Sequence, residues 1–436
     1  MNWLLVTFSL YVLTMVGLGV YFYVNQETKT VEDYLLAGRD VGIWPMAFSQ
    51  VASVASGWTF FAWVAVGYTV GMGGLWYSLT LPLVTLFVYR YIGPRLRTQS
   101  EEYRSLTVVD HLSRFFQDHG RVGDLIRVVG TVSVVLFLST YVGAQIIAVG
   151  DLTTVALDLN YVTGIVVGGI AVALYTALGG FDASIWTDFF QGVLMVVLAF
   201  ALPIMIILEL GGWGSFVSQA AALDSAHLSV TNGLAGVDLL VFVLAYFGLS
   251  LSVLGQPHAL VRFQAVRLEK LLSPASVVAV AFSTIRMTLP LFIGLGARVL
   301  YESVETPSNA AVLAMVEQFP GWIAGLLLAG LASAILPTSD SMMLVTAADV
   351  QRFVNRDASE RTMVYLSRAT VALLGLFGVV VAYYRPGTLF DIIVFAFVGL
   401  GASLGLPLAA LLLWDGYTPV GILGGIVTGI VATVAN

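Results

Sequence analysis

Long apolar runs, separated by short polar segments, follow one another along the whole chain. Between Val41 and Tyr89 there is no Asp, Glu, Lys or Arg. A membrane-spanning helix needs about 20 mostly apolar residues, so this interval alone is long enough for two crossings. A transmembrane barrel would show short alternating segments instead. The pattern predicts an all-α polytopic membrane protein with about twelve transmembrane helices, near residues 2–24, 43–68, 71–93, 125–149, 160–179, 183–208, 238–261, 272–299, 321–350, 365–383, 388–413 and 417–435.

The composition agrees with a membrane protein and excludes other classes. Charged residues make up 10% of the 436 residues, whereas a soluble domain typically carries about 25%. There is no Cys, which excludes disulfides, iron–sulfur centres and thiol catalysis, and the four His are scattered rather than clustered. We therefore exclude a nucleic-acid binder, a secreted disulfide scaffold and a soluble enzyme. Since no nucleophile–base pair is visible either, we expect no enzymatic activity.

The basic residues gather on one side of the predicted spans. Sixteen of the 19 Lys and Arg residues fall in the segments that join spans 1–2, 3–4, 7–8 and 9–10. Arg262, Arg267 and Lys270 are counted in the third of these segments. Because cytoplasmic loops are the ones rich in Lys and Arg, the N-terminus is predicted outside the cell membrane. With twelve spans, the C-terminus would lie outside as well.

Three ionisable residues lie within predicted spans, where each costs roughly 2.5–3.5 kcal/mol and usually serves a purpose. Asp188 lies about two turns into span 6, after a break predicted at the Gly pair 179–180. Asp340 follows Pro337 in a run rich in hydroxyls, and the oxygens there suit a small hard cation. An ordinary proline kink is the alternative for this run. Arg286 in span 8 fits no motif, and a structural ion pair is expected for it.

Two predicted spans contain interruptions. Span 2 has small polar residues over 52–59, and span 7 has Gly, Ser and Pro residues over 248–258. Interrupted helices five spans apart are typical of inverted repeats with a binding site near the membrane midplane. A packing interface lined by small residues is the alternative. The single transmembrane domain, 1–436, would then consist of a peripheral span, a first repeat, a second repeat and a last peripheral span, at residues 1–42, 43–208, 238–413 and 414–436.

These motifs resemble the sodium/solute symporter family, which includes the sodium-coupled sugar, proline and pantothenate transporters. Asp33–Arg39 resembles the loop before the family's first core helix, and Ala52–Trp58 is similar to that broken helix. Gly179–Gln191 is similar to the family signature, and Pro337–Ser341 looks like its Ser-Thr-Ala-Asp-Ser run. The resemblance implies the inverted five-plus-five helix repeat shared with the leucine transporter. It also implies sodium-coupled symport of a small organic solute into the cell by alternating access.

The resemblance further implies where sodium binds. The main sodium site would use three carbonyls and one hydroxyl, those of Ala52, Ala55, Ala334 and Thr338. A second hydroxyl is usual in the family, but Pro337 stands in its place, so Ser339, Ser341 or water would have to substitute. Some relatives bind a second sodium ion, and the corresponding residues here are Asp188, Asp340 and Ser341.

The run Gly255–Phe263 looks most like the proline-transporter branch. That branch has Trp and Tyr where this sequence has Leu249 and Val253, and an acidic residue where it has Val54. Since a few placed side chains decide what a pocket binds, we predict a small amino acid such as proline, or a carboxylate, rather than a sugar. The substrate site would draw on both interrupted spans, at Ser53, Ser56, Gly57, Trp58, Leu249, Val253, Gln256 and Pro257.

Two alternatives to sodium symport stay open. In a proton-coupled carrier, Asp188 and Asp340 would exchange protons, and the missing hydroxyl at Pro337 keeps this alternative open. A solute-sensing membrane domain without transport would need an attached signalling module. In the sodium-coupled interpretation, the partners are a small-molecule substrate, the co-transported sodium ion and the lipid bilayer. We expect no nucleic acid as a partner and a monomer sufficient for transport.

Overall fold

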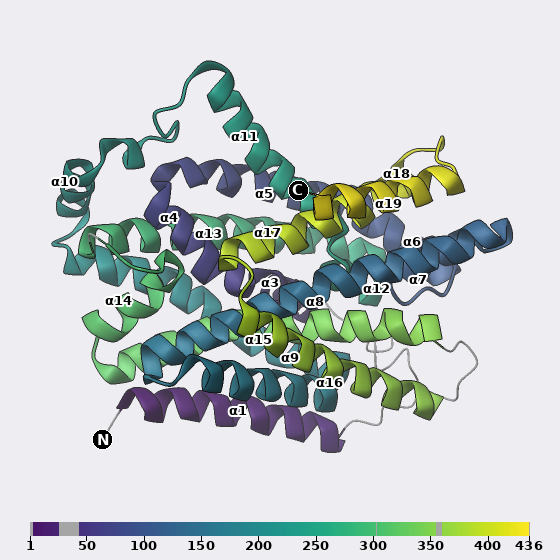
Figure 1. Cartoon of the computed structure of the whole chain (residues 1–436), viewed down its shortest axis with the longest axis horizontal. Helices are drawn as coiled ribbons and strands as arrows, with labels where there is room; N and C mark the ends of the chain where they lie inside the picture. Colours follow the sequence, from purple (N-terminus) through teal and green to yellow (C-terminus); the bar gives the residue numbers. More distant parts are fainter. Residues whose placement is uncertain (1–2, 26–42, 302, 355–359, 436) are drawn as a thin grey trace.

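A computed structural model describes residues 3–25, 43–301, 303–354 and 360–435 of the chain (Figure 1). Over these residues the backbone forms helices joined by turns and loops, without a β-strand. The helices of the first half are α1 (Trp3–Asn25), α3 (Ile43–Gly57), α4 (Trp63–Thr69), α5 (Leu75–Phe87), α6 (Gly93–Glu102), α7 (Val108–Phe115), α8 (Arg121–Leu157) and α9 (Tyr161–Glu209). Those of the second half are α10 (Trp213–Leu223), α11 (Gly236–Leu251), α12 (Pro257–Ala265), α13 (Leu272–Leu300), α14 (Ala310–Gln318), α15 (Gly321–Val354), α16 (Glu360–Tyr384), α17 (Leu389–Leu400), α18 (Leu406–Leu413) and α19 (Pro419–Ala435).

The apolar segments lie where the sequence predicts them. Within the described ranges, eight helical segments are long and apolar enough to cross a membrane. Three shorter apolar helices cover Trp3–Leu18, Tyr161–Leu174 and Pro419–Ala435. The interrupted segment of α3 and α4 accounts for the remaining predicted span. The predicted multi-span helical fold is therefore confirmed, whereas the division into two repeats stays a prediction, and the motif Asp33–Arg39 lies outside the described residues.

Helix α9 differs from the prediction, because its backbone is helical through the Gly pair 179–180, where a break was expected. A straight helix of its 49 residues would be about 73 Å long, more than twice the hydrocarbon thickness of a bilayer. Its halves nevertheless meet the same residue of α1: Tyr11 lines a cavity with Val172 and accepts a hydrogen bond from Gln191. Both halves of α9 thus have residues near Tyr11 of α1.

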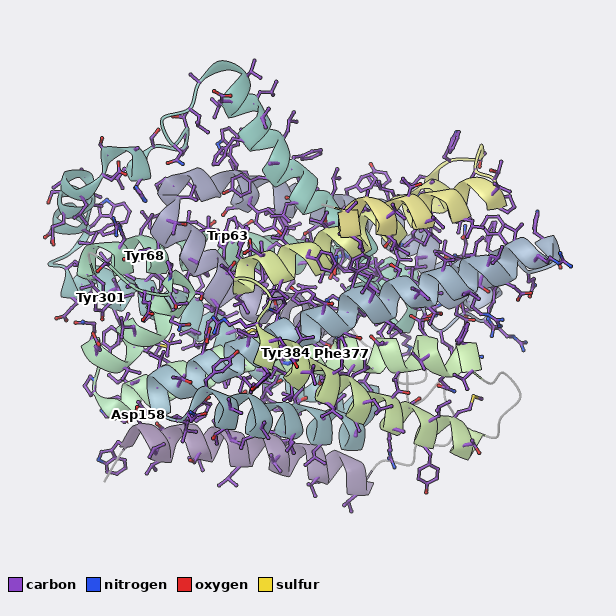
Figure 2. The ribbon with its side chains drawn as sticks, in the orientation of Figure 1. Trp63, Tyr68, Asp158, Tyr301, Phe377 and Tyr384 are labelled. Atoms are coloured by element: carbon purple, nitrogen blue, oxygen red, sulfur yellow. The ribbon has the colours of Figure 1, made fainter. Side chains whose placement is uncertain are left out.

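Helix α15 lies at the centre of the molecule, in contact with α1, α3, α8, α9 and α16 (Figure 1). Around this centre, aromatic side chains pack inward from α4, where Trp63 is fully buried and the Tyr68 hydroxyl donates to Tyr301 O (Figure 2). Large apolar side chains on the periphery are exposed instead, as Phe377 and Tyr384 on α16 are. An extensive exposed apolar surface is what a lipid-facing protein needs.

Both predicted interruptions are confirmed. In α3 the backbone leaves helical geometry at Ser56, with φ 54° and ψ 177°, and a π-helical turn follows over Trp58–Ala62. That conformation is otherwise nearly restricted to glycine, so Ser56 is strained. In span 7, α11 ends at Leu251, a 3₁₀ turn covers Ser252–Gly255, and the extended Gln256 precedes α12.

The interruption in span 7 packs closely against α17 and the turn that follows it. A Cβ on Gly255 would lie 2.1 Å from the carbonyl oxygen of Leu400, a contact that no real side chain makes. The chain around Leu400 continues into a π-helical turn over Gly401–Gly405. Glycine at position 255 is therefore required by this backbone-to-backbone approach rather than by its own φ angle.

Candidate functional site

Three buried oxygen atoms meet where α3 passes α15. The Thr338 hydroxyl lies 3.3 Å from Ala334 O in its own helix and 3.4 Å from Ala52 O on α3. All three residues are fully buried. Two carbonyls and a hydroxyl are hard ligands of the kind that bind small cations. The carbonyl of Ala55, also predicted for sodium, accepts the hydroxyl of Thr59 at 2.6 Å.

Side chains of α8 hold the interruption in α3 in place. The Tyr141 hydroxyl lies 3.0 Å from Ser56 Oγ, and Gln145 Oε1 accepts the backbone N–H of Gly57 at 2.8 Å. Ser56 Oγ in turn accepts the N–H of Trp58 at 3.0 Å. These bonds satisfy backbone groups that the irregular geometry removes from the helical ladder. Neither Tyr141 nor Gln145 is predicted by the sequence patterns.

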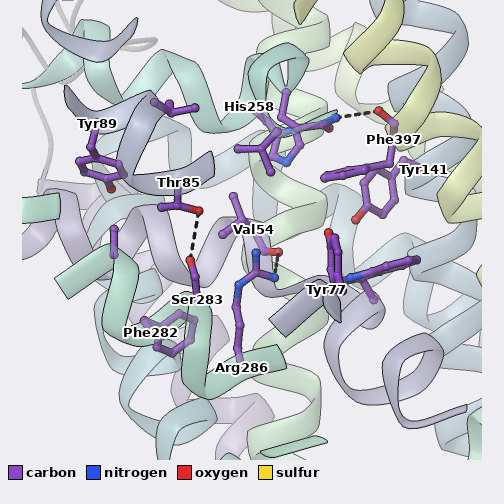
Figure 3. A pocket seen from close by; sticks show the side chains of 15 residues that line it. Val54, Tyr77, Thr85, Tyr89, Tyr141, His258, Phe282, Ser283, Arg286 and Phe397 are labelled. Atoms are coloured by element: carbon purple, nitrogen blue, oxygen red, sulfur yellow. Dashed lines mark hydrogen bonds between the residues drawn. The ribbon is translucent and has the colours of Figure 1, made fainter. Parts of the chain in front are cut away.

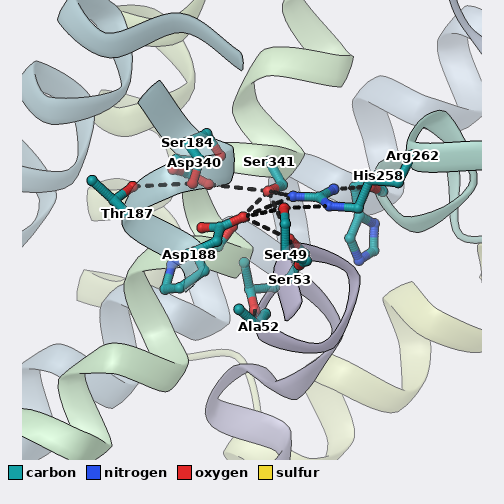
Figure 4. Close-up of polar contacts among 12 residues, drawn as sticks. Ser49, Ala52, Ser53, Ser184, Thr187, Asp188, His258, Arg262, Asp340 and Ser341 are labelled. Carbon is teal, nitrogen blue, oxygen red and sulfur yellow. Dashed lines mark hydrogen bonds and ion pairs between the residues drawn. The ribbon is translucent and has the colours of Figure 1, made fainter. Parts of the chain in front are cut away.

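A second polar cluster surrounds Asp188, close to Ala52 of α3 (Figure 4). Asp188 Oδ2 accepts the hydroxyl of Ser49 at 2.7 Å and that of Ser53 at 3.3 Å. It also forms an ion pair with Arg262, whose terminal nitrogen lies 3.1 Å away. The carboxylate and the guanidinium are both almost completely buried, which makes the pair strongly interdependent.

Arg262 connects this cluster to α15. Its guanidinium donates to the Ser341 hydroxyl at 2.8 Å and to the main-chain oxygen of His258 one turn earlier. Ser341 also donates to Asp340 Oδ1 at 3.1 Å. The three residues predicted for a second sodium ion therefore share one cluster, but a guanidinium stands among them. The assignment of Arg262 to a cytoplasmic loop is wrong, since the residue is buried on α12.

A cavity of about 40 Å³ lies on the other side of the interruption in α3 (Figure 3). Trp58 forms one wall and stacks on Phe397 of α17, with ring centroids 6.4 Å apart and an interplanar angle of 10°. Gln256 reaches in from the interruption in span 7, where its side-chain nitrogen donates to Phe397 O at 3.0 Å. Tyr77 and Arg286 also line the cavity. Both interrupted spans thus contribute to one small cavity with several aromatic side chains in its lining.

Comparison with known proteins identifies the family. A model of the sodium:solute symporter family matches residues 34–429. The chain belongs to this family. The symporter is also similar to curated sodium/proline symporters of Staphylococcus aureus, such as those of strains JH9 and NCTC 8325. Each is 27% identical over 442 residues, which cover 98% of this chain and 85% of the relative.

Solved structures show that the symporter has the fold expected from the resemblance. A Na⁺-coupled sialic acid symporter in a substrate-bound outward-open state matches with a TM-score of 0.75 and 18% identity, covering 100% of this chain and 98% of that chain. MhsT in complex with L-phenylalanine matches with a TM-score of 0.61 and 15% identity, over 91% and 98% of the two chains. The predicted family and fold are confirmed, and the class of activity is sodium-coupled solute symport.

The residues predicted for the substrate divide into two groups in the symporter. Trp58, Val253 and Gln256 line the cavity. The others lie elsewhere: Ser53 joins the Asp188 cluster, Ser56 and Gly57 form the interruption in α3, Leu249 packs against the hydrophobic core, and Pro257 begins α12. The substrate residues stay a prediction, with the first group best placed to contact a solute.

Arg286 has no acidic partner among the described residues, so the ion pair expected for it is not found there. Its terminal nitrogen donates to Val54 O at 3.0 Å, and among the described residues it forms no ion pair. In the sequence, the only sign that Arg286 is unusual is that a charged residue lies deep within an apolar span. The partner on α3 is 232 residues away along the chain, and no local pattern points to it.

Proposed function

We propose that the symporter imports a small organic solute, a small amino acid such as proline or a carboxylate, by alternating access across the cell membrane with its N-terminus outside. A sodium ion bound by the oxygens of Ala52, Ala334 and Thr338 would provide the driving force. The observation that carries this proposal is the convergence of those oxygens, one turn before the interruption at Ser56. The orientation is supported by the basic residues of the predicted cytoplasmic segments.

The position of these oxygens explains how sodium and solute would be coupled. Ala52 belongs to α3, and the π-helical turn that follows α3 contributes Trp58 to the cavity, whereas Ala334 and Thr338 belong to α15. An ion between the two helices would favour the arrangement in which they are close. A ligand shifts a conformational equilibrium only by its differential affinity for the two states, so sodium must bind that arrangement more tightly.

The energy available from one sodium ion is sufficient for accumulation of the solute. A membrane potential of 100 mV supplies about 2.3 kcal/mol for each charge moved inward. This corresponds to roughly fortyfold accumulation of solute per ion, before the sodium concentration gradient is added. The sodium/proline symporters among the relatives support an amino acid as solute, although Leu249 and Val253 replace two aromatic residues of that branch.

Uptake into proteoliposomes tests the proposal. The purified protein is reconstituted, and uptake of L-proline and of a panel of amino acids, carboxylates and sugars is measured with an inward sodium gradient. Sodium is then replaced by choline at fixed pH, with and without an inward proton gradient. Uptake that requires sodium supports the proposal. Uptake that a proton gradient drives equally well in choline would establish proton coupling instead.

A further inference from the structure

The cavity beside Trp58 contains several buried polar atoms that have no partner within the described protein. They are side-chain atoms of residues from the interruption in span 7, α12, α13 and the turn after α5: Gln256 Oε1, His258 Nδ1, Arg286 Nε and the Tyr89 hydroxyl. Buried polar groups are nearly always hydrogen-bonded, so a group of them around one space points to a polar ligand.

Of these groups, Arg286 most needs a charged partner. It is buried, with an exposed fraction of 5%, and its guanidinium points toward the space between Val54 and Tyr77 (Figure 3). Within the described part of the chain it donates one hydrogen bond, to Val54 O, and its Nε has no partner. Among the described residues no carboxylate lies within ion-pair distance of it. A guanidinium cannot lose its proton in a protein, and a buried charge without a counter-charge is costly.

From this arrangement we infer that Arg286 binds a carboxylate of the transported solute. Its Nε–H edge is unused, and a guanidinium presents two parallel donors to a carboxylate in a bidentate pair. The bond from the other terminal nitrogen to Val54 O would remain in place. The solute supplies the missing negative charge, so the pocket selects an organic anion or a zwitterion and rejects a neutral molecule of the same shape.

The rest of the cavity limits the size of this solute. Its volume of about 40 Å³ holds only a few water molecules, so a small solute enters with some displacement of side chains. Trp58, Tyr77 and Phe397 provide flat apolar surfaces for the body of the solute, as in most small-molecule sites. A short-chain carboxylate or a small amino acid fits this description better than a sugar, which would need many polar partners.

Arg286 also connects the solute to the oxygens proposed to bind sodium. Val54 lies two residues after Ala52 in α3, so a solute held by Arg286 stabilises the segment that carries a proposed sodium ligand. This inference rests on the proposed function for the identity of the ion, but the role of Arg286 is tested separately from it. Binding of an acid can depend on Arg286 whether or not sodium is required.

Binding to the purified protein tests the role of Arg286. Thermal shifts are measured, with and without sodium, for two matched pairs, L-proline with L-prolinamide and propionate with propionamide, and for pyruvate, glucose and myo-inositol. At least one carboxylate is expected to bind, and its amide at least tenfold more weakly. Arg286→Gln is expected to weaken binding of that acid 10- to 100-fold, equivalent to about 1.4–2.8 kcal/mol, and Arg286→Lys to recover part of it. Arg298→Gln, on the same helix but stacked on Tyr68, serves as the control and keeps wild-type affinity.

The outcomes separate the two proposals. A thermal shift by sodium alone in Arg286→Gln shows that the variant is folded; if it cannot be purified, the comparison of acid with amide in the wild type decides. Equal affinity for acid and amide, or wild-type affinity in Arg286→Gln, would overturn the assignment. If only the neutral solutes bind, and only with sodium, the assignment of Arg286 is overturned but sodium symport is not. Acid binding that needs Arg286 but not sodium would support the assignment and contradict sodium coupling.

Discussion

The buried pair of Asp188 and Arg262 gives a quantitative prediction, because both groups are almost inaccessible to water and lie 3.1 Å apart. Breaking a buried pair by removing one partner typically costs about 3–5 kcal/mol. Asp188→Asn is expected at the upper end, because the guanidinium stays charged after it loses the carboxylate that it pairs with. Arg262→Met is expected at the lower end, because Asp188 keeps the hydroxyls of Ser49 and Ser53 and can take up a proton.

A double-mutant cycle measures this interaction. The wild type, Asp188→Asn, Arg262→Met and the double variant are unfolded by denaturing detergent, followed by intrinsic fluorescence. The double variant removes both partners of the pair, so it is expected to be more stable than Asp188→Asn. This requires an interaction energy above about 3 kcal/mol, the cost expected for Arg262→Met alone. Additive effects within about 0.5 kcal/mol would refute the reasoning, since they would show that the two charges are not interdependent.

The same pair has a consequence for transport. Because Arg262 takes the place that a second cation would need beside Asp188, sodium activation of uptake in the wild type is expected to follow a single-site curve. Asp188→Asn is expected to impair uptake while the protein still inserts into the membrane. A sigmoidal sodium curve in the wild type, or normal sodium-driven uptake in Asp188→Asn, would contradict this account of the cluster.

Three further predictions concern the two interruptions and a buried histidine outside the predicted spans. Gly255→Ala is expected to abolish uptake, because its Cβ would collide with Leu400 O, whereas Gly248→Ala, with open space around it, is expected to behave as wild type. Ser56→Gly is expected to retain uptake, because glycine adopts the strained backbone at this position without cost, whereas Ser56→Val is expected to abolish it. Burial lowers the pKa of His111 from 6.5 to about 4. The stability that the neutral imidazole contributes is therefore fully present above pH 6.5. It decreases as the pH falls toward 4, by about 2 kcal/mol at pH 5.

Each of these predictions has its own measurement. The Gly255→Ala and Gly248→Ala variants are compared by uptake per molecule of reconstituted protein. Equal uptake by the two would contradict the argument that Gly255 is required by close packing. For Ser56, folding is checked by gel filtration, and an active Val variant would show that the interruption is not needed. For His111, apparent melting temperatures are recorded from pH 8 to pH 5 for the wild type and His111→Gln. An identical decline in both would show that another group carries the pH dependence.

Much of the fold follows from the sequence because lipid imposes a simple rule on it. Every spanning segment must form the hydrogen bonds of its own backbone and present apolar side chains to the lipid. Twelve apolar runs therefore predict the positions of the spans. The interruptions at Ser56 and Gly255–Pro257 are visible for the same reason, since small residues and proline break an otherwise uniform pattern. The break expected at the Gly pair 179–180 shows the limit: glycine permits an irregular backbone but does not impose one.

The site is less accessible from sequence, because its contacts join residues far apart in the chain. Ala52 and Thr338 were placed together through the family resemblance, and 286 residues separate them. Arg262 lies just beyond the apolar run of its span, where a basic residue usually belongs to a loop, so the sequence pattern predicts its place wrongly. Its partner Asp188 is 74 residues away, and only the packing of α12 against the core shows that the two charges are buried together.

The sodium dependence of uptake in Thr338 variants tests the central claim most directly. Thr338→Ala removes the hydroxyl that lies between Ala52 O and Ala334 O, whereas Thr338→Ser keeps it. We expect Thr338→Ala to raise the sodium concentration for half-maximal uptake about tenfold, equivalent to about 1.4 kcal/mol, with a near-normal rate at saturating sodium. Thr338→Ser is expected to stay close to the wild type. The same sodium dependence in Thr338→Ala and the wild type would contradict a sodium site at these oxygens.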